Sequence, residues 1–63
     1  MLKKYNIIVS YANSHGELMK DELRYPYIVA ENVQDAIINV ITYFAKDPEI
    51  LKRGYILRGV RVE

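Results

Sequence analysis

The sequence contains no cysteine and no tryptophan, and it has only two prolines, three glycines and one histidine. Without cysteine the chain forms neither a disulfide nor a thiolate metal site, which fits a reducing compartment. The single histidine, His15, follows Ser14 in a predicted turn, where neighbouring side chains rarely point at each other. A nucleophile needs a base within hydrogen-bond reach, so this pair does not predict nucleophilic catalysis.

Long apolar runs and glycine-rich loops are also missing. No segment approaches the roughly 18 apolar residues of a membrane helix. The first apolar run, residues 7–9, is too short for the core of a signal peptide. Gly16, Gly54 and Gly59 lie far apart, so they form no phosphate-binding loop. We therefore expect a soluble, cytoplasmic protein that does not contact membranes.

The charge is close to balanced, with nine basic and eight acidic residues and a net charge of +1. A DNA mimic would be strongly acidic, and a general nucleic-acid binder would be clearly basic. Residues with AT-rich codons (Ile, Lys, Asn and Tyr) make up more than a third of the chain. This composition suggests an AT-rich genome, and we expect a viral or mobile-element origin, with the host cytoplasm as the location.

Three segments have the pattern of β-strands. Residues 3–12 alternate, with Tyr5, Ile7, Val9 and Tyr11 on the better core face, and Ile8 on the other face suggests that this face is also partly covered. Residues 25–30 form a second strand, in which Pro26 must lie at a start or an edge. Residues 55–62 form a third strand whose alternation slips at Arg58-Gly59, which predicts a bulge.

The clearest element is a helix from about residue 33 to residue 46. Asn32 is a good N-cap, Asp35 suits the first turn, and apolar residues recur every three or four positions. Asp47 and Pro48 end this helix and can begin a short one over 48–53, capped by Gly54.

Residues 17–24 allow two interpretations. Ser14 and Glu17 match a capping box, and the segment that follows has high helix propensity, which predicts a short helix at 15–23. Alternatively, residues 13–16 form a turn and the chain returns as an irregular strand of a hairpin. The sequence does not decide between them.

The predicted architecture is a single small α+β domain over residues 1–63. It has a three-stranded, mainly antiparallel sheet with one long helix packed on one face, in the order β-β-α-β, and extra short helices at 15–23 and 48–53 as candidates. The expected core consists of Ile7, Val9, Tyr27, Val29, Ala36, Ile37, Val40, Ile41, Phe44, Leu57, Val60 and Val62.

Carboxylate pairs offer little chemistry. Asp21-Glu22 is explained by a solvated face beside basic residues, and Asp47 and Glu49 are explained by the start of a helix. The spacing of an oxygen-ligand metal site is absent. We therefore predict no catalytic, cofactor-binding or metal-binding residues, and a protein that is not an enzyme.

Tyrosine is the most unusual feature, with six residues against one phenylalanine. Tyrosine combines a large contact area with a polar group and is enriched at interfaces. A small three-stranded sheet with open edges cannot bury all six. We therefore predict a non-enzymatic protein-interaction module that forms homodimers and modulates an unidentified host protein. The predicted contacts are Tyr11, Tyr25, Tyr27 and Ile38.

The alternative is a small nucleic-acid-binding domain. Basic residues gather in the last dozen positions around an aromatic residue, and two lysines near the start join them if the first and last strands are neighbours. Aromatic side chains within a basic sheet face grip single strands. The candidates for this role are Lys3, Lys4, Lys52, Arg53, Tyr55, Arg58 and Arg61.

Overall fold

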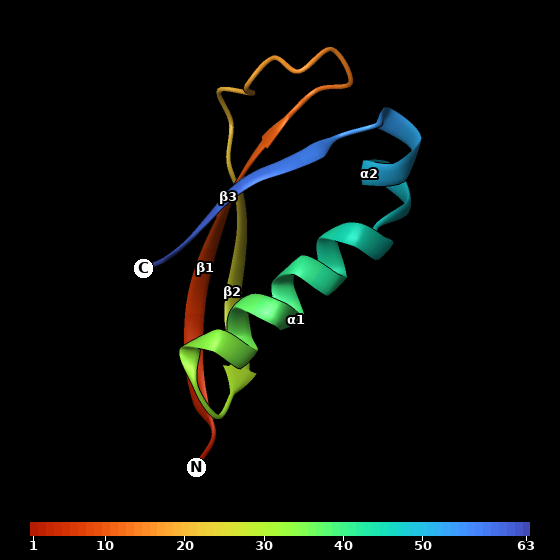
Figure 1. Cartoon of the computed structure of the whole chain (residues 1–63). Helices are drawn as coiled ribbons and strands as arrows, with labels where there is room; N and C mark the ends of the chain where they lie inside the picture. Colours follow the sequence, from red (N-terminus) through yellow and green to blue (C-terminus); the bar gives the residue numbers. More distant parts are fainter.

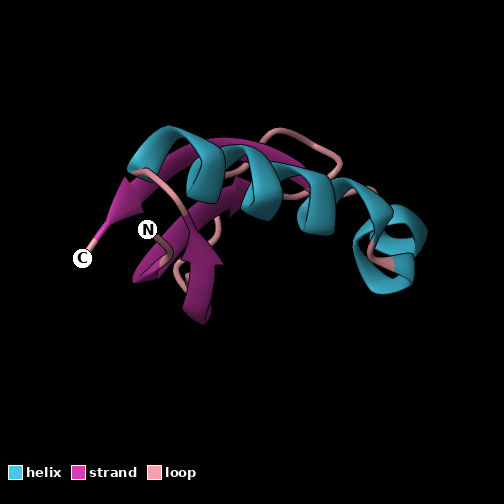
Figure 2. Ribbon diagram, turned by 90° about the horizontal axis from the view of Figure 1, so that it is seen from below, coloured by secondary structure: helices cyan, strands magenta, loops and turns pink.

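The structure, a computed structural model, describes residues 1–63 and shows the predicted α+β arrangement (Figure 1). The chain order is β1 (Lys3–Ala12), β2 (Leu23–Ala30), α1 (Val33–Lys46), α2 (Pro48–Arg53) and β3 (Ile56–Val62). β1 lies at the centre of an antiparallel sheet in the order β2-β1-β3. α1 runs across one face of this sheet, mainly against β2 and β1 (Figure 2). The other face carries no helix.

α1 forms where its end signals and apolar spacing predict it. The Asn32 side chain accepts a hydrogen bond from the backbone N–H of Asp35, which satisfies a free donor of the first turn. Ala36, Val40 and Phe44 recur at four-residue spacing and are buried against the sheet. The bounds 33–46 are as predicted.

The short helix α2 confirms the prediction for 48–53. Asp47 accepts a hydrogen bond from the Glu49 N–H, Pro48 occupies the first turn, and Gly54 ends the helix with a left-handed φ of 69°. α2 buries Ile50 in the core and lies beside the start of β3.

The helix predicted at 15–23 is wrong, and the hairpin interpretation is correct. Asn13, rather than Ser14, organises the turn: its side-chain oxygen accepts hydrogen bonds from the N–H groups of His15 and Glu17. Gly16 takes a φ of 85°, and its N–H donates to the Asn13 carbonyl. The chain then returns and pairs Leu18 with Ala12. The asparagine turn therefore prevails over helix propensity.

Both outer strands contain one residue more than the stretch of β1 that they pair with. In β3 the register shifts between Leu57 and Gly59, so Arg58 is the extra residue. This confirms the bulge predicted from the slipped alternation. The bulge keeps Leu57, Val60 and Val62 on the helix side of the sheet.

The bulge in β2 was not predicted and changes the core. Tyr5 pairs with Ile28 and Ile7 pairs with Tyr25, so Pro26 and Tyr27 together oppose Asn6. The side-chain alternation of β2 is shifted beyond this point. Ile28 and Ala30 therefore face α1, while Tyr27 and Val29, which were predicted to lie in the core, are exposed.

The core lies between α1, α2 and the helix side of the sheet. Its buried members are Ile7, Val9, Tyr11, Ala30, Ala36, Val40, Phe44 and Ile50. Two further residues predicted for the core are largely exposed, Ile41 at 43% and Val62 at 41%. Ile41 is exposed because it lies beside the buried stripe of α1. Val62 is exposed because it belongs to β3, the strand that α1 covers least.

Candidate protein-interaction surface

The sheet face opposite α1 is partly covered by its own charged side chains. Ile8 lies on this face, yet it is only 2% exposed. Its neighbours across the sheet are Arg24 on β2 and Arg61 on β3. Long arginine stems can cover apolar surface while the guanidinium groups stay in water. This covering explains the buried Ile8 and confirms that the second face is partly shielded.

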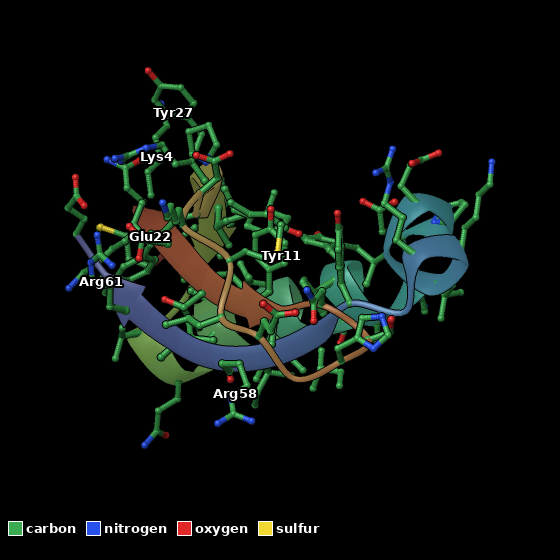
Figure 3. All side chains as sticks on the ribbon, turned by 90° about the horizontal axis from the view of Figure 1, so that it is seen from above. Lys4, Tyr11, Glu22, Tyr27, Arg58 and Arg61 are labelled. Atoms are coloured by element: carbon green, nitrogen blue, oxygen red, sulfur yellow. The ribbon has the colours of Figure 1, made fainter.

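The two guanidinium groups belong to a network of ion pairs across the three strands. Arg61 binds both carboxylate oxygens of Glu22, with 3.0 Å between Nη2 and Oε1, and Ser10 Oγ donates to the same carboxylate at 3.2 Å. Arg24 lies 3.7 Å from the Glu63 carboxylate. The hydrogen bonds from Arg61 lower the pKa of Glu22 below its usual range, and the same contact raises the pKa of Arg61. Figure 3 shows Glu22 and Arg61 side by side at this end of the molecule.

The β2 bulge gives Tyr27 an unusual backbone conformation. Its φ is 60°, and it is the one non-glycine residue of the chain with a positive φ. Bulky residues rarely occupy this region, and the left-handed conformation costs about 1–2 kcal/mol in L-residues. The Asn6 side-chain oxygen accepts a hydrogen bond from the Tyr27 N–H at 3.4 Å and holds the bulge. A strained, structurally fixed residue of this kind is typical of functional sites.

The Tyr27 ring points away from the body of the protein (Figure 3). It is 72% exposed, so burial of the ring does not compensate the strain. The Lys4 ammonium lies 6.0 Å from the ring centroid, at the outer limit of a cation–π contact. The ring is therefore available to a partner.

A cleft of about 240 Å³ adjoins Tyr27 and the bulge. Its lining residues come from β1, β2 and the end of the chain: Asn6, Ile7, Ile8, Arg24, Tyr25, Pro26, Tyr27 and Glu63. Ligand pockets usually measure about 300–1,000 Å³. The cleft is smaller than that range and suits one side chain better than a cofactor. It combines apolar walls with one positive and one negative group.

The structure separates the four predicted contact residues. Tyr11 is 7% exposed and its ring centroid lies 4.8 Å from that of Tyr55, so it belongs to the core and is not available for contact. Tyr25 is half-buried on the helix side, and burial, with a further effect of the Asp47 charge, raises its pKa. Tyr27 is exposed on the open sheet face, and Ile38 is exposed on α1, across the molecule. The predicted contact tyrosines therefore do not share one face, because the bulge turns Tyr27 to the face opposite Tyr11 and Tyr25.

The seven candidate nucleic-acid contacts are also dispersed. Lys3 and Lys4 are at the start of β1, whereas Lys52, Arg53 and Tyr55 adjoin its other end, because Ala12 pairs with Ile56. At 3.4 Å per residue, Lys4 and Ala12 are about 27 Å apart along the strand.

The arginines of this set are oriented differently from one another. Arg53 binds Glu49 at 3.0 Å, and Arg61 binds Glu22 and lies 3.9 Å from Glu63. Arg58 is the bulge residue of β3 and projects away from Tyr27 (Figure 3). No continuous basic face results.

Asn6, Arg24 and Glu63, which line the cleft, were not predicted from the sequence. Their roles depend on strand register, which the sequence pattern did not supply. Pro26 was the available signal, because proline inside a strand is typical of an edge or a bulge.

The structure contains no cluster of three or more histidine, cysteine, aspartate or glutamate side chains arranged to hold a metal ion. Neither helix combines the length and the apolar character required to cross a membrane. Comparisons with protein-family models, curated proteins and solved structures give no match.

Proposed function

We propose that this protein is a non-enzymatic protein-interaction module that forms homodimers and binds a partner protein on its open sheet face. The observation that supports this function is Tyr27, a strained and exposed aromatic residue at the edge of a small cleft. The strain destabilises the fold by about 1–2 kcal/mol, and the ring is not buried in return. A role in contact with another molecule accounts for keeping tyrosine at this position.

The size and chemistry of the site favour a protein partner. Interface hot spots are enriched in tyrosine and arginine, and they pair pockets with inserted side chains. The cleft has room for one inserted side chain, between the Tyr27 ring and the Arg24–Glu63 pair. The dispersed and partly neutralised basic residues give the nucleic-acid alternative less support than this local site gives protein binding.

An affinity-capture experiment with three forms of the chain tests the proposal. Wild type, Tyr27→Ala and Tyr43→Ala are immobilised, and proteins retained from cells of the natural host are quantified by mass spectrometry. Tyr43 is an exposed tyrosine on α1 and serves as the matched control. We expect at least one protein to be retained by wild type and by Tyr43→Ala and to be lost with Tyr27→Ala. Equal retention by all three forms, or no specific retention by wild type, would contradict the proposed role of Tyr27.

A further inference from the structure

The outward surface of α1 carries almost no charge. Its two charged side chains are at its ends, Asp35 in the first turn and Lys46 in the last. Between them, Ile38 and Ile41 are 59% and 43% exposed. A helix that packs one face on a core ordinarily presents charged and polar residues on the other face. An outer face with two exposed isoleucines and no charge between its ends is typical of a surface that a partner covers.

The exposed residues of α1 follow the spacing of a helix–helix seam. Positions four, three and four residues apart form a stripe, and all of them are exposed: Gln34, Ile38, Ile41 and Ala45. This is the spacing of the contact positions in a coiled coil. At 100° per residue the stripe is turned away from the buried side of α1. No other part of the chain covers the stripe, since all four positions are exposed.

The stripe is complementary to itself when two helices run in opposite directions. With a two-fold axis between Ile38 and Ile41, each Ile38 faces Ile41 of the second copy, and each Gln34 faces Ala45. The same arrangement brings Asp35 near Lys46 of the second copy, at both ends of the contact. Antiparallel helices also place opposite ends of their dipoles together. A parallel pair would instead bring like charges together at both ends.

We propose that two copies of this chain associate through an antiparallel contact of their α1 helices, along the seam of Gln34, Ile38, Ile41 and Ala45. This inference rests on the homodimer of the proposed function and assigns its interface. Each sheet would lie outside the helix pair, so both Tyr27 surfaces remain open to partner proteins. α1 is about 21 Å long, and a helix pair of this length falls below the standard interface of about 800 Å² per partner. We therefore expect a reversible equilibrium in which the fraction of dimer rises with protein concentration.

Sedimentation velocity over a concentration series up to hundreds of micromolar tests the interface. Wild type is compared with Ile38→Glu, Ile41→Glu and the control Leu18→Glu, which places the same charge at an exposed apolar position of the hairpin tip. We expect wild type and Leu18→Glu to dimerise equally. The two helix variants should raise the dissociation constant at least about tenfold, because each buries unpaired carboxylates in the seam. Far-UV circular dichroism verifies that all four remain folded.

Two results overturn the inference in different ways. A wild-type chain that stays monomeric throughout the series removes the homodimer altogether. A dimer that Ile38→Glu and Ile41→Glu leave intact places the interface elsewhere, while the homodimer itself stands. Neither result affects capture through Tyr27, so failure here is distinguishable from failure of the partner-binding proposal.

The orientation of the helices has its own test, because the natural chain contains no cysteine. Gln34→Cys and Ala45→Cys variants are mixed and oxidised mildly. Disulfides require Cα atoms within about 7 Å, whereas positions 34 and 45 are about 16 Å apart along one helix. The antiparallel contact predicts a disulfide between the two different variants. Disulfides that link each variant to itself, with little mixed product, would indicate parallel helices and overturn the proposed geometry.

Discussion

Replacing Tyr27 by glycine should yield a more stable protein than replacing it by alanine. Both substitutions remove a ring that is 72% exposed, so little buried apolar area changes. They differ in backbone freedom: alanine keeps the strain of a φ of 60°, and glycine relieves it. The relief is about 1–2 kcal/mol. The greater freedom of glycine in the unfolded chain offsets about 0.5–1 kcal/mol of that gain.

The expected difference in the free energy of unfolding is therefore about 0.5–1 kcal/mol in favour of Tyr27→Gly. In a domain of this size it corresponds to a melting-temperature difference of roughly 2–8 °C. Urea denaturation followed by circular dichroism measures it, provided that unfolding is two-state.

Tyr43 supplies a control with the opposite sign. It lies inside α1, where glycine is less favourable than alanine by about 1 kcal/mol. Tyr43→Gly should therefore be less stable than Tyr43→Ala. If Tyr27→Gly were also less stable than Tyr27→Ala, the bulge would not be strained in solution, and the argument that links strain to function would fail.

Two further predictions concern the Gly54 cap of α2 and the Glu22–Arg61 ion pair. Gly54→Ala should lower the free energy of unfolding by about 1–2 kcal/mol in a urea titration, because a left-handed φ is strained for a residue with a Cβ atom and this atom would lie 3.2 Å from Ser14 Cβ. The control Gly59→Ala should change little, because its Cβ atom would lie 4.0 Å from the nearest neighbour and its φ is not positive. Equal effects of the two substitutions would refute the assignment of Gly54 as the cap. The lowered pKa of Glu22 stabilises the fold above the usual carboxyl pKa of about 4.3, and this contribution disappears as the pH falls through the lower folded-state pKa. Glu22→Gln should therefore lose less stability than wild type as the pH falls below about 4. If both proteins lost the same stability with falling pH, the Glu22–Arg61 contact would not contribute to the acid sensitivity of the fold.

The sequence predicted those elements whose signals are local. Asn32, Pro48 and Gly54 mark helix ends through their own side chains or backbone preferences, and each performs the predicted role. The Arg58 bulge was also readable, because apolar residues on both sides of it had to face one core. These local signals do not supply the strand register, which determines how the strands pair.

The candidate site was less accessible to sequence reasoning. The turn of Tyr27 to the open face depends on the register of β2 against β1, a pairing between residues about twenty positions apart. Simple alternation from Tyr25 onward placed Tyr27 and Val29 in the core, and Tyr11 was predicted as an exposed contact although the alternation of its own strand put it on the core face. One extra residue in β2 reverses the first assignment, and the packing of Tyr55 on Tyr11 reverses the second. Ile38, which was predicted as a contact, is exposed on α1, and its position depends only on the local spacing of that helix.

We propose that Tyr27 keeps its strained conformation because its ring contacts a partner protein. Isothermal titration of the captured partner with wild type, Tyr27→Gly and Tyr43→Ala tests this claim most directly. We expect Tyr27→Gly, despite its relieved backbone, to bind at least about tenfold more weakly than wild type, because it lacks the aromatic hot spot. Tyr43→Ala should bind like wild type. Equal affinity of Tyr27→Gly and wild type would contradict the claim.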